Sequence, residues 1–563
     1  MAVLPDTEAV AAPATVEIAP LADLGMRMAD GDWVGLESLP LTLEAIDGTT
    51  VAQLSGTPTA AMATARVMRA AQAFFELPSH APLAAPAPAR PSAAATRTAS
   101  AVRARAATRA LGDVLGRKTI SAYLDRETQL MRILYKQVVL RFKPGTPQKV
   151  RNAIIRESGL RLFAENPLAP GQVTLSDDAG LFPGEALVRL AAKLSALDEV
   201  AFAAPDFISQ YRRSAPAAAG TPSAKQWHLK LVGATQAWKL TRGKRDIVVA
   251  VLDDGIDVEH PELRANLLRN PDPDEPRDLC GRDFYLPDDD ADHFNPRPKR
   301  FRAPFEEMAG NDIHGTCCAG VAVGRGPKAY GLAPNCRLLP VKVFHADDLA
   351  SDSRVADAIR YAAHFADVIS CSWGGAKSPD IEFALRDARA IGRKGRGAVV
   401  VCATGNDERK QVDYPASDVN AMAIGASTDA EDLAWYSNTG AQVCVVAPSN
   451  GGTRGIFTTD VSTPGRGFNI GAVAAGGADG LFANDFGGTS SATPLVAGLC
   501  ALILSLKPEM TPDDVRGILI ASAKKIGPAS AYKANGHSNR FGHGRIDAAK
   551  AVALAKAWKK PAG

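Results

Sequence analysis

Apolar runs alternate with amphipathic stretches over the second half of the chain. Strand-like runs lie at residues 247–252, 338–344, 368–372 and 397–402, and helix-like stretches lie at residues 353–365 and 381–394. Short apolar runs are typical of strands that are buried on both faces. Strands that alternate with helices favour a parallel sheet with helices on both faces. The pattern therefore predicts an α/β domain in this part of the chain.

A second, shorter pattern precedes this domain. Strand-like runs lie at residues 138–142, 161–164, 172–175 and 200–207, and helix-like stretches at residues 147–157 and 185–197. The order is β-α-β-β-α-β, which is the split pattern of ferredoxin-like domains. We therefore predict a separate small domain over residues 130–213.

The first 129 residues carry no comparable pattern. Residues 1–81 are acidic, with a helix expected at residues 59–76, and their role is unknown. A recruitment module that binds an unidentified partner and a largely disordered arm both remain open. Residues 82–129 are rich in Ala, Pro and Arg, with too few large apolar side chains to pack, which predicts a linker with one possible helix.

Composition narrows the class of partner. The 563 residues include 64 basic and 61 acidic side chains, a net charge of +3, so nothing favours nucleic acid or an anionic membrane. The first basic residue is Arg27, and no apolar run reaches about 18 residues, so neither a secretory signal nor a membrane span is predicted. We expect a cytoplasmic protein, with non-Sec export left open. Most of the eight cysteines lie in small or apolar strings, which are typical of reduced, buried thiols.

Candidate chemistry begins at Gly488-Thr489-Ser490, which leads into an apolar stretch. The glycine permits a tight turn, and the serine hydroxyl would then lie at a helix N-terminus, where unpaired N–H groups favour negative charge. Pro494 is expected in the first turn, where its missing N–H costs little. Taken alone, the string is equally typical of a helix cap before a buried helix.

Suitable partners for this serine lie upstream. The apolar run 248–252 ends in Asp253, which places a carboxylate at the C-terminal end of a strand, where ligands bind in open α/β sheets. His314 opens a string of small residues with helical character. An aspartate that orients a histidine, a histidine that takes the serine proton and a serine that attacks a carbonyl recur together on unrelated folds.

Two further strings could bind a substrate. An apolar strand leads to Asn406, whose side-chain amide could donate a hydrogen bond to a tetrahedral oxyanion. Residues 369–374 predict a strand with an exposed edge, which an extended peptide could join as an extra strand.

With these motifs in this order, residues 226–558 resemble the subtilisin-like serine proteases, or subtilases. The motifs are D-D-G, H-G-T-x-x-A-G, S-W-G, A-x-G-N and G-T-S-x-A-x-P. The resemblance implies a subtilisin-like parallel sheet, a triad of Asp253, His314 and Ser490, and Asn406 as the oxyanion donor. The substrate would be flanked by Ser372, Trp373, Gly374, Ala403, Thr404 and Gly405.

Several details are nearer to the kexin and furin branch of this family. They include the doubled Asp253-Asp254 and Cys318. Kexin-like enzymes carry a β-rich domain after the protease domain, whereas this sequence ends at Gly563 without one. Kexin-like specificity therefore stays an alternative.

The resemblance also implies that the two domains have different functions. Residues 130–213 would be a propeptide that acts in cis as folding chaperone and inhibitor, with its C-terminal end in the substrate cleft, and residues 214–563 would be the protease domain. Arg213 is the second residue of a dibasic pair. Self-cleavage is expected after it if the substrate pocket accepts arginine, and an ordinary solvated arginine pair is the alternative.

We interpret the chain as a serine endopeptidase made as a zymogen, which cleaves protein or peptide substrates through an acyl-enzyme. A site-specific processing protease with basic preference and an inactive binding module are the alternatives. Catalysis would need no cofactor. Structural calcium stays open, with the acidic string at residues 288–292 as its candidate site and an ordinary acidic surface loop as the alternative.

Overall fold

The computed structural model describes short strands between residues 25 and 52, residues 122–125, and residues 128–560 apart from gaps. The longest gaps are residues 214–225 and 300–311. The helix predicted at residues 59–76 and most of the predicted linker lie outside the described residues.

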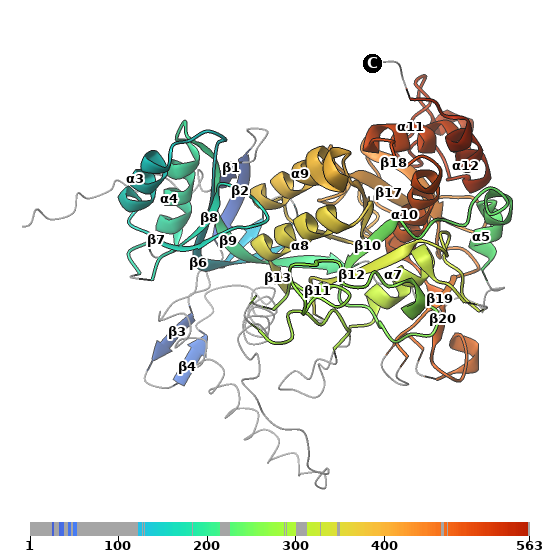
Figure 1. Cartoon of the computed structure of the whole chain (residues 1–563), viewed down its shortest axis with the longest axis horizontal. Coiled ribbons are helices and arrows are strands. Elements are labelled where there is room, and N and C mark those ends of the chain that lie inside the picture. Colours follow the sequence, from blue (N-terminus) through green and yellow to red (C-terminus); the bar gives the residue numbers. More distant parts are fainter. Residues whose placement is uncertain are drawn as a thin grey trace, which may run out of the picture.

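Seven parallel strands form the central sheet of the second half of the chain (Figure 1). In spatial order they are β11 (Arg282–Asp283), β12 (Arg337–Lys342), β10 (Val248–Asp253), β14 (Val368–Cys371), β16 (Val399–Ala403), β17 (Met422–Ser427) and β18 (Val443–Pro448). All residues of β10, β14, β16, β17 and β18 are buried, as expected for apolar strands covered on both sides. The predicted parallel sheet is confirmed, and we call this region the parallel-sheet domain.

Helices cover both faces of this sheet, as predicted. The main ones are α7 (His314–Val323), α8 (Asp352–Phe365), α9 (Pro379–Gly395), α10 (Gly488–Leu506), α11 (Pro512–Ser522) and α12 (Ala548–Ala557), and α5 (Trp227–Leu231) and α6 (Ala234–Ala237) are short. Alternate residues of β10 divide between two cores. Val249 and Val251 belong to the core that includes α7 and α10. Val248 and Ala250 belong to the core that includes α8 and α9.

Helix α10 is buried in a core of the parallel-sheet domain. It is apolar enough to span a membrane, with a mean hydropathy of 1.7, but 94% of its apolar window is buried inside the protein. Its hydrophobicity is therefore explained by its position in the core, and it carries Ser490 at its N-terminal end.

An antiparallel sheet precedes this domain. Its strands lie in the order β7 (Arg161–Glu165), β8 (Gln172–Ser176), β6 (Met131–Phe142), β9 (Val200–Arg213). Helices α3 (Gln148–Glu157) and α4 (Glu185–Ser195) complete the predicted β-α-β-β-α-β order. Apolar side chains of α4 pack into the same core as those of β6 and β9. We call this region the antiparallel-sheet domain.

Further strands lie where the sequence predicts none. Strand β5 (Ala122–Asp125) pairs with the first residues of β6, β2 (Trp33–Ser38) pairs with β5, and β1 (Gly25–Arg27) pairs with β2. Separately, β3 (Leu43–Ile46) pairs with β4 (Thr49–Ala52). Part of the region before residue 130 therefore pairs with the antiparallel sheet, which the sequence did not predict.

Strand β9 leaves its own sheet and enters the other domain. The sequence predicts a strand that ends at residue 207, but β9 continues to Arg213. Its last residues pair with β13 (Leu349–Ser351) and β15 (Trp373–Gly375), both antiparallel. The extra length has its partners more than a hundred residues further along the chain, so no local pattern could reveal it.

Candidate active site

The end of β9 lies along the substrate-flanking residues expected from the sequence. Tyr211, Arg212 and Arg213 stand opposite Gly375, Gly374 and Trp373. An exposed strand edge that accepts an extended peptide is a common recognition mode. The predicted edge at residues 369–374 is only partly correct, because β14 (Val368–Cys371) is paired on both sides within the parallel sheet. The edge is offered by β15 (Trp373–Gly375) alone, and the chain's own strand occupies it.

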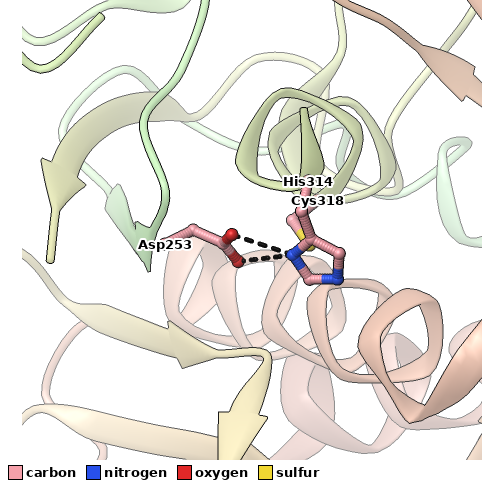
Figure 2. A group of neighbouring side chains, drawn as sticks. All are labelled: Asp253, His314 and Cys318. Atoms are coloured by element: carbon pink, nitrogen blue, oxygen red, sulfur yellow. Dashed lines mark hydrogen bonds and ion pairs between the residues drawn. The ribbon is translucent and has the colours of Figure 1, made fainter. Parts of the chain in front are cut away.

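Asp253 and His314 are brought together at the carboxyl end of the sheet (Figure 2). Asp253 ends β10 and His314 begins α7, and both side chains are buried. Nδ1 of His314 lies 2.8 and 3.0 Å from the two carboxylate oxygens of Asp253. This contact holds the ring proton on Nδ1. Nε2, the basic nitrogen, is buried and has no hydrogen-bond partner among the described residues.

The second aspartate of the pair holds the helix that carries His314. The Asp254 carboxylate accepts hydrogen bonds from the backbone N–H groups of Ile313, His314 and Gly315 at 2.9, 3.0 and 2.8 Å. A carboxylate at this position pairs the free N–H groups of a helix N-terminus and complements its dipole. Asp254 therefore fixes where α7 begins. The doubled aspartate was visible in the sequence, but its capping role was not.

Ser490 lies in the first turn of α10. Gly488, at the start of the helix, has φ +72°, a conformation that favours glycine. The Ser490 hydroxyl donates to the carbonyl oxygen of Ser372 at 3.1 Å, and the Ser372 hydroxyl donates to the carbonyl oxygen of Ser490 at 3.1 Å. The structure thus joins Asp253 to His314 and Ser490 to Ser372, but it does not join Ser490 to His314. Catalytic hydrogen bonds often tighten only when a substrate is bound.

Cys318 lies between the Asp253–His314 pair and the Ser490–Ser372 pair. Its sulfur is 3.7 Å from Nδ1 of His314 and 3.7 Å from the carbonyl oxygen of Ser490. Burial raises the pKa of the Cys318 thiol to about 11, so it is neutral near pH 7. One small side chain therefore touches both the histidine and the serine segment.

Pro494 does not lie in the first turn, as the sequence suggested. Helix α10 begins at Gly488, so Pro494 is in the second turn. Proline has no N–H to offer the carbonyl four residues before it, which is that of Ser490. This oxygen accepts from Ser372 and Cys318 instead. The proline thus frees a backbone acceptor that helps to fix the serine segment.

The Asn406 side chain is held by the residue that precedes Ser490. It follows β16, and its Oδ1 accepts from both the N–H and the hydroxyl of Thr489, each at 2.9 Å. Its Nδ2 is buried without a hydrogen-bond partner among the described residues. An unpaired buried donor is costly and rare in native proteins. Asn406 contacts Thr489, the residue before Ser490, so its free N–H group could donate to a negative charge that develops near the serine.

The other predicted substrate segment, Ala403-Thr404-Gly405, follows the end of β16. A Cβ atom on Gly405 would lie 2.4 Å from a carboxylate oxygen of Asp413, and one on Gly374 would lie 2.9 Å from the Asp413 Cβ. Asp413 therefore lies directly behind both substrate-flanking segments. It accepts hydrogen bonds from Arg409 at 2.5 Å and from Asn438 at 3.2 Å. No motif in the sequence marked this residue.

Metal ligation is a weaker interpretation of the same centre. Asp253, His314 and Cys318 have potential ligand atoms within 4.8 Å of one another, the one such group among the described residues. However, Nδ1 of His314 is already engaged by Asp253. All eight cysteines are free and buried, as expected.

Two carboxylates of the acidic string, the candidate calcium site, are paired with basic side chains. Asp288 pairs with Arg354 at 2.5 Å, and Asp292 pairs with Lys299 at 3.3 Å. Asp289 lies outside the described residues. Calcium needs six to eight oxygen ligands, so a site here would need further oxygens beside these two carboxylates.

Activity should fall on the acid side at a pH above the ordinary histidine value. Burial alone would lower the pKa of His314, but the Asp253 carboxylate outweighs it and raises this pKa well above its usual range. The base must be neutral, so kcat/KM should be lost as the pH falls through a value above about 6.5. A pH profile of kcat/KM measures this limb. A flat profile, or a limb below about 6.5, would exclude His314 as the base.

Comparison with known proteins decides the family. The sequence profile of the subtilase family (peptidase S8) matches residues 244–544, more than half of the chain. The chain belongs to the subtilase family. The subtilase is 35% identical over 407 residues to the calcium-dependent protease of Nostoc sp., a match that covers 66% of this chain and 56% of that protein. It is 28% identical over 363 residues to the dibasic-processing endoprotease of Yarrowia lipolytica, covering 59% and 33%.

This subtilase thus spans about half the length of its first curated relative. Among solved structures it is similar to fervidolysin from Fervidobacterium pennivorans, a keratinolytic enzyme related to subtilisin. The TM-score is 0.55 at 19% identity, and the match covers 76% of this chain and 62% of that chain. That likeness supports the fold.

Proposed function

We propose that this subtilase is a serine endopeptidase made as a zymogen. The observation that carries the proposal is a pair of buried, unpartnered polar atoms beside one serine: the basic Nε2 of His314 and the donor Nδ2 of Asn406. Unpaired buried groups cost free energy, and they persist where a reaction uses them. An inactive binding module has no need of either.

The reaction follows from these atoms. With a substrate carbonyl in place, the Ser490 hydroxyl would turn from Ser372 toward His314, give its proton to Nε2 and bond to the carbonyl carbon. Asn406 and the N-terminus of α10 would stabilise the oxyanion. His314 would then protonate the departing amine, leaving an acyl-enzyme, and a water molecule activated by the same Nε2 would release the acid and restore the serine.

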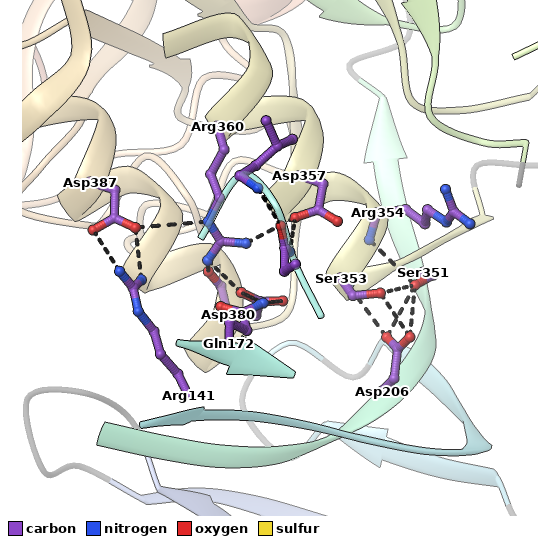
Figure 3. A network of polar contacts seen from close by, with 12 residues as sticks. Arg141, Gln172, Asp206, Ser351, Ser353, Arg354, Asp357, Arg360, Asp380 and Asp387 are labelled. Carbon is purple, nitrogen blue, oxygen red and sulfur yellow. Dashed lines mark hydrogen bonds and ion pairs between the residues drawn. The ribbon is translucent and has the colours of Figure 1, made fainter. Parts of the chain in front are cut away.

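The zymogen part of the proposal rests on the contacts of the antiparallel-sheet domain. Strand β9 covers the peptide edge, and a polar network joins its sheet to α8 and α9 (Figure 3). Arg141 pairs with Asp387 at 2.7 Å. Asp206 on β9 accepts from the Ser353 hydroxyl at 2.8 Å, near the N-terminus of α8. A domain held this way would keep a substrate from the same edge.

A fluorophosphonate probe tests the function directly. An activated serine attacks the phosphorus and expels fluoride, so the labelled residue reports the nucleophile. We expect the probe to mark Ser490 in the matured full chain, with parallel loss of peptide cleavage. Cleavage that continues after complete labelling, or a label on another serine, would refute the proposal.

Self-cleavage is expected at the end of β9. The sequence predicts cleavage of the bond after Arg213. Arg213 stands opposite Trp373, so a strand that continued in the same register would place residue 214 opposite Ser372, whose carbonyl oxygen accepts from the Ser490 hydroxyl. This register favours cleavage of the bond after residue 214. N-terminal sequencing of the matured chain distinguishes the two bonds. The new terminus is Ser214 after cleavage behind Arg213, and Ala215 after cleavage behind residue 214. The new terminus should be absent from Ser490→Ala. A full-length enzyme that is active and stable would contradict self-cleavage.

A basic preference is a second candidate, supported by Asp413 behind Gly374 and Gly405. We expect Arg or Lys just before the scissile bond to raise kcat/KM over Ala on the order of 10-fold or more, as for a hydrogen bond to a charged group. Asp413→Asn should remove the preference. Arg409→Ala should strengthen it, because Arg409 pairs with Asp413 in the structure. Equal rates for Arg and Ala peptides in the wild type would exclude it.

Structural calcium rests on the name of the Nostoc relative. The melting temperature of the full chain with calcium and with a chelator tests it. An unchanged melting temperature would remove calcium from the proposal. A calcium effect that survives Asp288→Asn would place the site elsewhere than the acidic string.

A further inference from the structure

Three arginines lie close together beside the amino ends of β10 and β12. Arg245 precedes β10, Arg337 begins β12, and Arg325 follows α7. Val248, the first residue of β10, is paired with Arg337, whereas Asp253 lies five positions further along β10. Five residue steps along a strand span about 16 Å. The three arginines are therefore at the edge of the parallel sheet opposite the candidate active site.

A buried asparagine joins the three segments that carry these arginines. Asn266 is fully buried, and its Oδ1 accepts from Nη1 of Arg245 at 2.8 Å. Its Nδ2 donates to the carbonyl oxygens of Val323 and Pro334 at 2.7 and 2.8 Å. These two carbonyl groups lie two and three residues before the second and the third arginine. One side chain thus fixes all three segments relative to one another.

The three positive charges are not paired within the protein. None of the guanidinium groups forms an ion pair with a carboxylate among the described residues. Nε of Arg337 donates to the backbone carbonyl oxygen of Arg245 instead. Burial, and after it the charges of Arg325 and Arg337, lower the pKa of the Arg245 guanidinium, so these charges lie near it. The closest acidic neighbour along the backbone of Arg325 is Glu262, whose carboxylate accepts from two backbone N–H groups.

The number of guanidinium groups indicates which ligand fits. Guanidinium groups bind carboxylate and phosphate through parallel N–H···O hydrogen bonds. A carboxylate has two oxygens, whereas a phosphate group has three strong acceptor oxygens, one for each arginine. Nucleic acid or an anionic membrane would need a wide basic surface, and the net charge of this chain is only +3. A small molecule that carries a phosphate group therefore fits best.

We propose that Arg245, Arg325 and Arg337 form a binding site for the phosphate group of a soluble small molecule. This site does not depend on the proposed protease function. The bound group would connect three segments at the amino ends of β10 and β12. Binding should therefore stabilise the parallel-sheet domain, because a ligand that binds only the folded state raises its stability.

Thermal unfolding of the full chain with inorganic phosphate tests the site. Ser490→Ala is the background for all measurements, so that self-cleavage cannot contribute. At a phosphate concentration well above Kd, we expect the melting temperature to rise by about 2 °C or more. Succinate at the same ionic strength is the control anion, because it carries a similar charge on two carboxylates. An equal rise with succinate, or no rise with phosphate, would overturn the site.

Arg325→Gln separates this site from general effects of phosphate on stability. The Arg325 side chain is exposed, so the variant should fold, and the loss of one of three like charges should not lower the melting temperature without phosphate. The rise with phosphate should disappear. Arg242→Gln is the matched control, since Arg242 lies on the same loop as Arg245 but its guanidinium stacks on Trp238 and Tyr330. If Arg325→Gln keeps the same rise as this control, the assignment is wrong.

Calorimetric titration measures the affinity without unfolding the protein. We expect the Kd for phosphate to be weaker on the order of 10-fold or more in Arg325→Gln than in Arg242→Gln, as for the loss of a hydrogen bond between charged groups. Equal affinity in the two variants would place the phosphate elsewhere and refute the site.

Discussion

Ser490→Ala should fold as the wild type and lose almost all peptide cleavage. In subtilisin, removal of the equivalent hydroxyl costs about 2 × 10⁶ in kcat, and we expect a loss of the same order. The reason is that no other group can form the acyl-enzyme, while the oxyanion donor and the substrate edge remain. Folding should survive, because the hydroxyl makes one hydrogen bond, to Ser372. The measurements are kcat on a peptide substrate and the melting temperature.

Ser491→Ala is the matched control for this experiment. Ser491 is the next residue on α10, equally buried, and its hydroxyl donates to Ser449 and not to the Ser490–Ser372 pair. Turnover should stay within a few-fold of the wild type. If Ser490→Ala retains wild-type turnover, or if both changes abolish it equally, Ser490 is not the nucleophile.

Asn406→Ala should lower kcat by about 10²–10³ with little change in KM. This magnitude is the one measured for the same kind of donor in subtilisin and is carried over from that enzyme. The donor is used only when negative charge develops on the substrate oxygen, so its loss falls on the transition state and not on substrate binding. The measurement is steady-state kinetics with one peptide.

Asn406→Asp separates the donor from the rest of the side chain. An aspartate keeps an oxygen that can accept from Thr489, as Oδ1 of Asn406 does. It has no N–H to donate, and its charge would repel the oxyanion. We expect a loss at least as large as with alanine. Wild-type kcat in either variant would remove Asn406 from the site.

Local pattern was enough to predict the parallel sheet, because strands such as β10 and β16 are apolar on both faces and stand out from the helices between them. The proximity of Asp253 and His314 was implied by the resemblance of their motifs to those of the subtilases. No strand pattern places His314, because it begins a helix. The extension of β9 to Arg213 could not be predicted from local pattern, because its pairing partners lie far along the chain.

Other features depend on three-dimensional contacts that no motif encodes. The hydroxyl of Ser490 donates to the carbonyl oxygen of Ser372, a residue more than a hundred positions earlier in the chain. Asp254 looked like part of a signature but caps α7. Asp413 lies behind two glycines that only the folded chain brings together. Pro494 was assigned to the wrong turn because α10 begins at Gly488, two residues before the serine and well before the apolar run.

Strand β9 belongs to the antiparallel sheet and also pairs with β13 and β15, two short strands of the parallel-sheet domain. While the chain is intact, binding of β9 at the cleft is intramolecular. The effective concentration of this blocking strand therefore does not change when the protein is diluted. A cut beyond β9 would break no hydrogen bond of the strand, but it would make the blockade bimolecular. From then on, dilution and destruction of the released domain, rather than the cut itself, would set the moment at which the cleft opens.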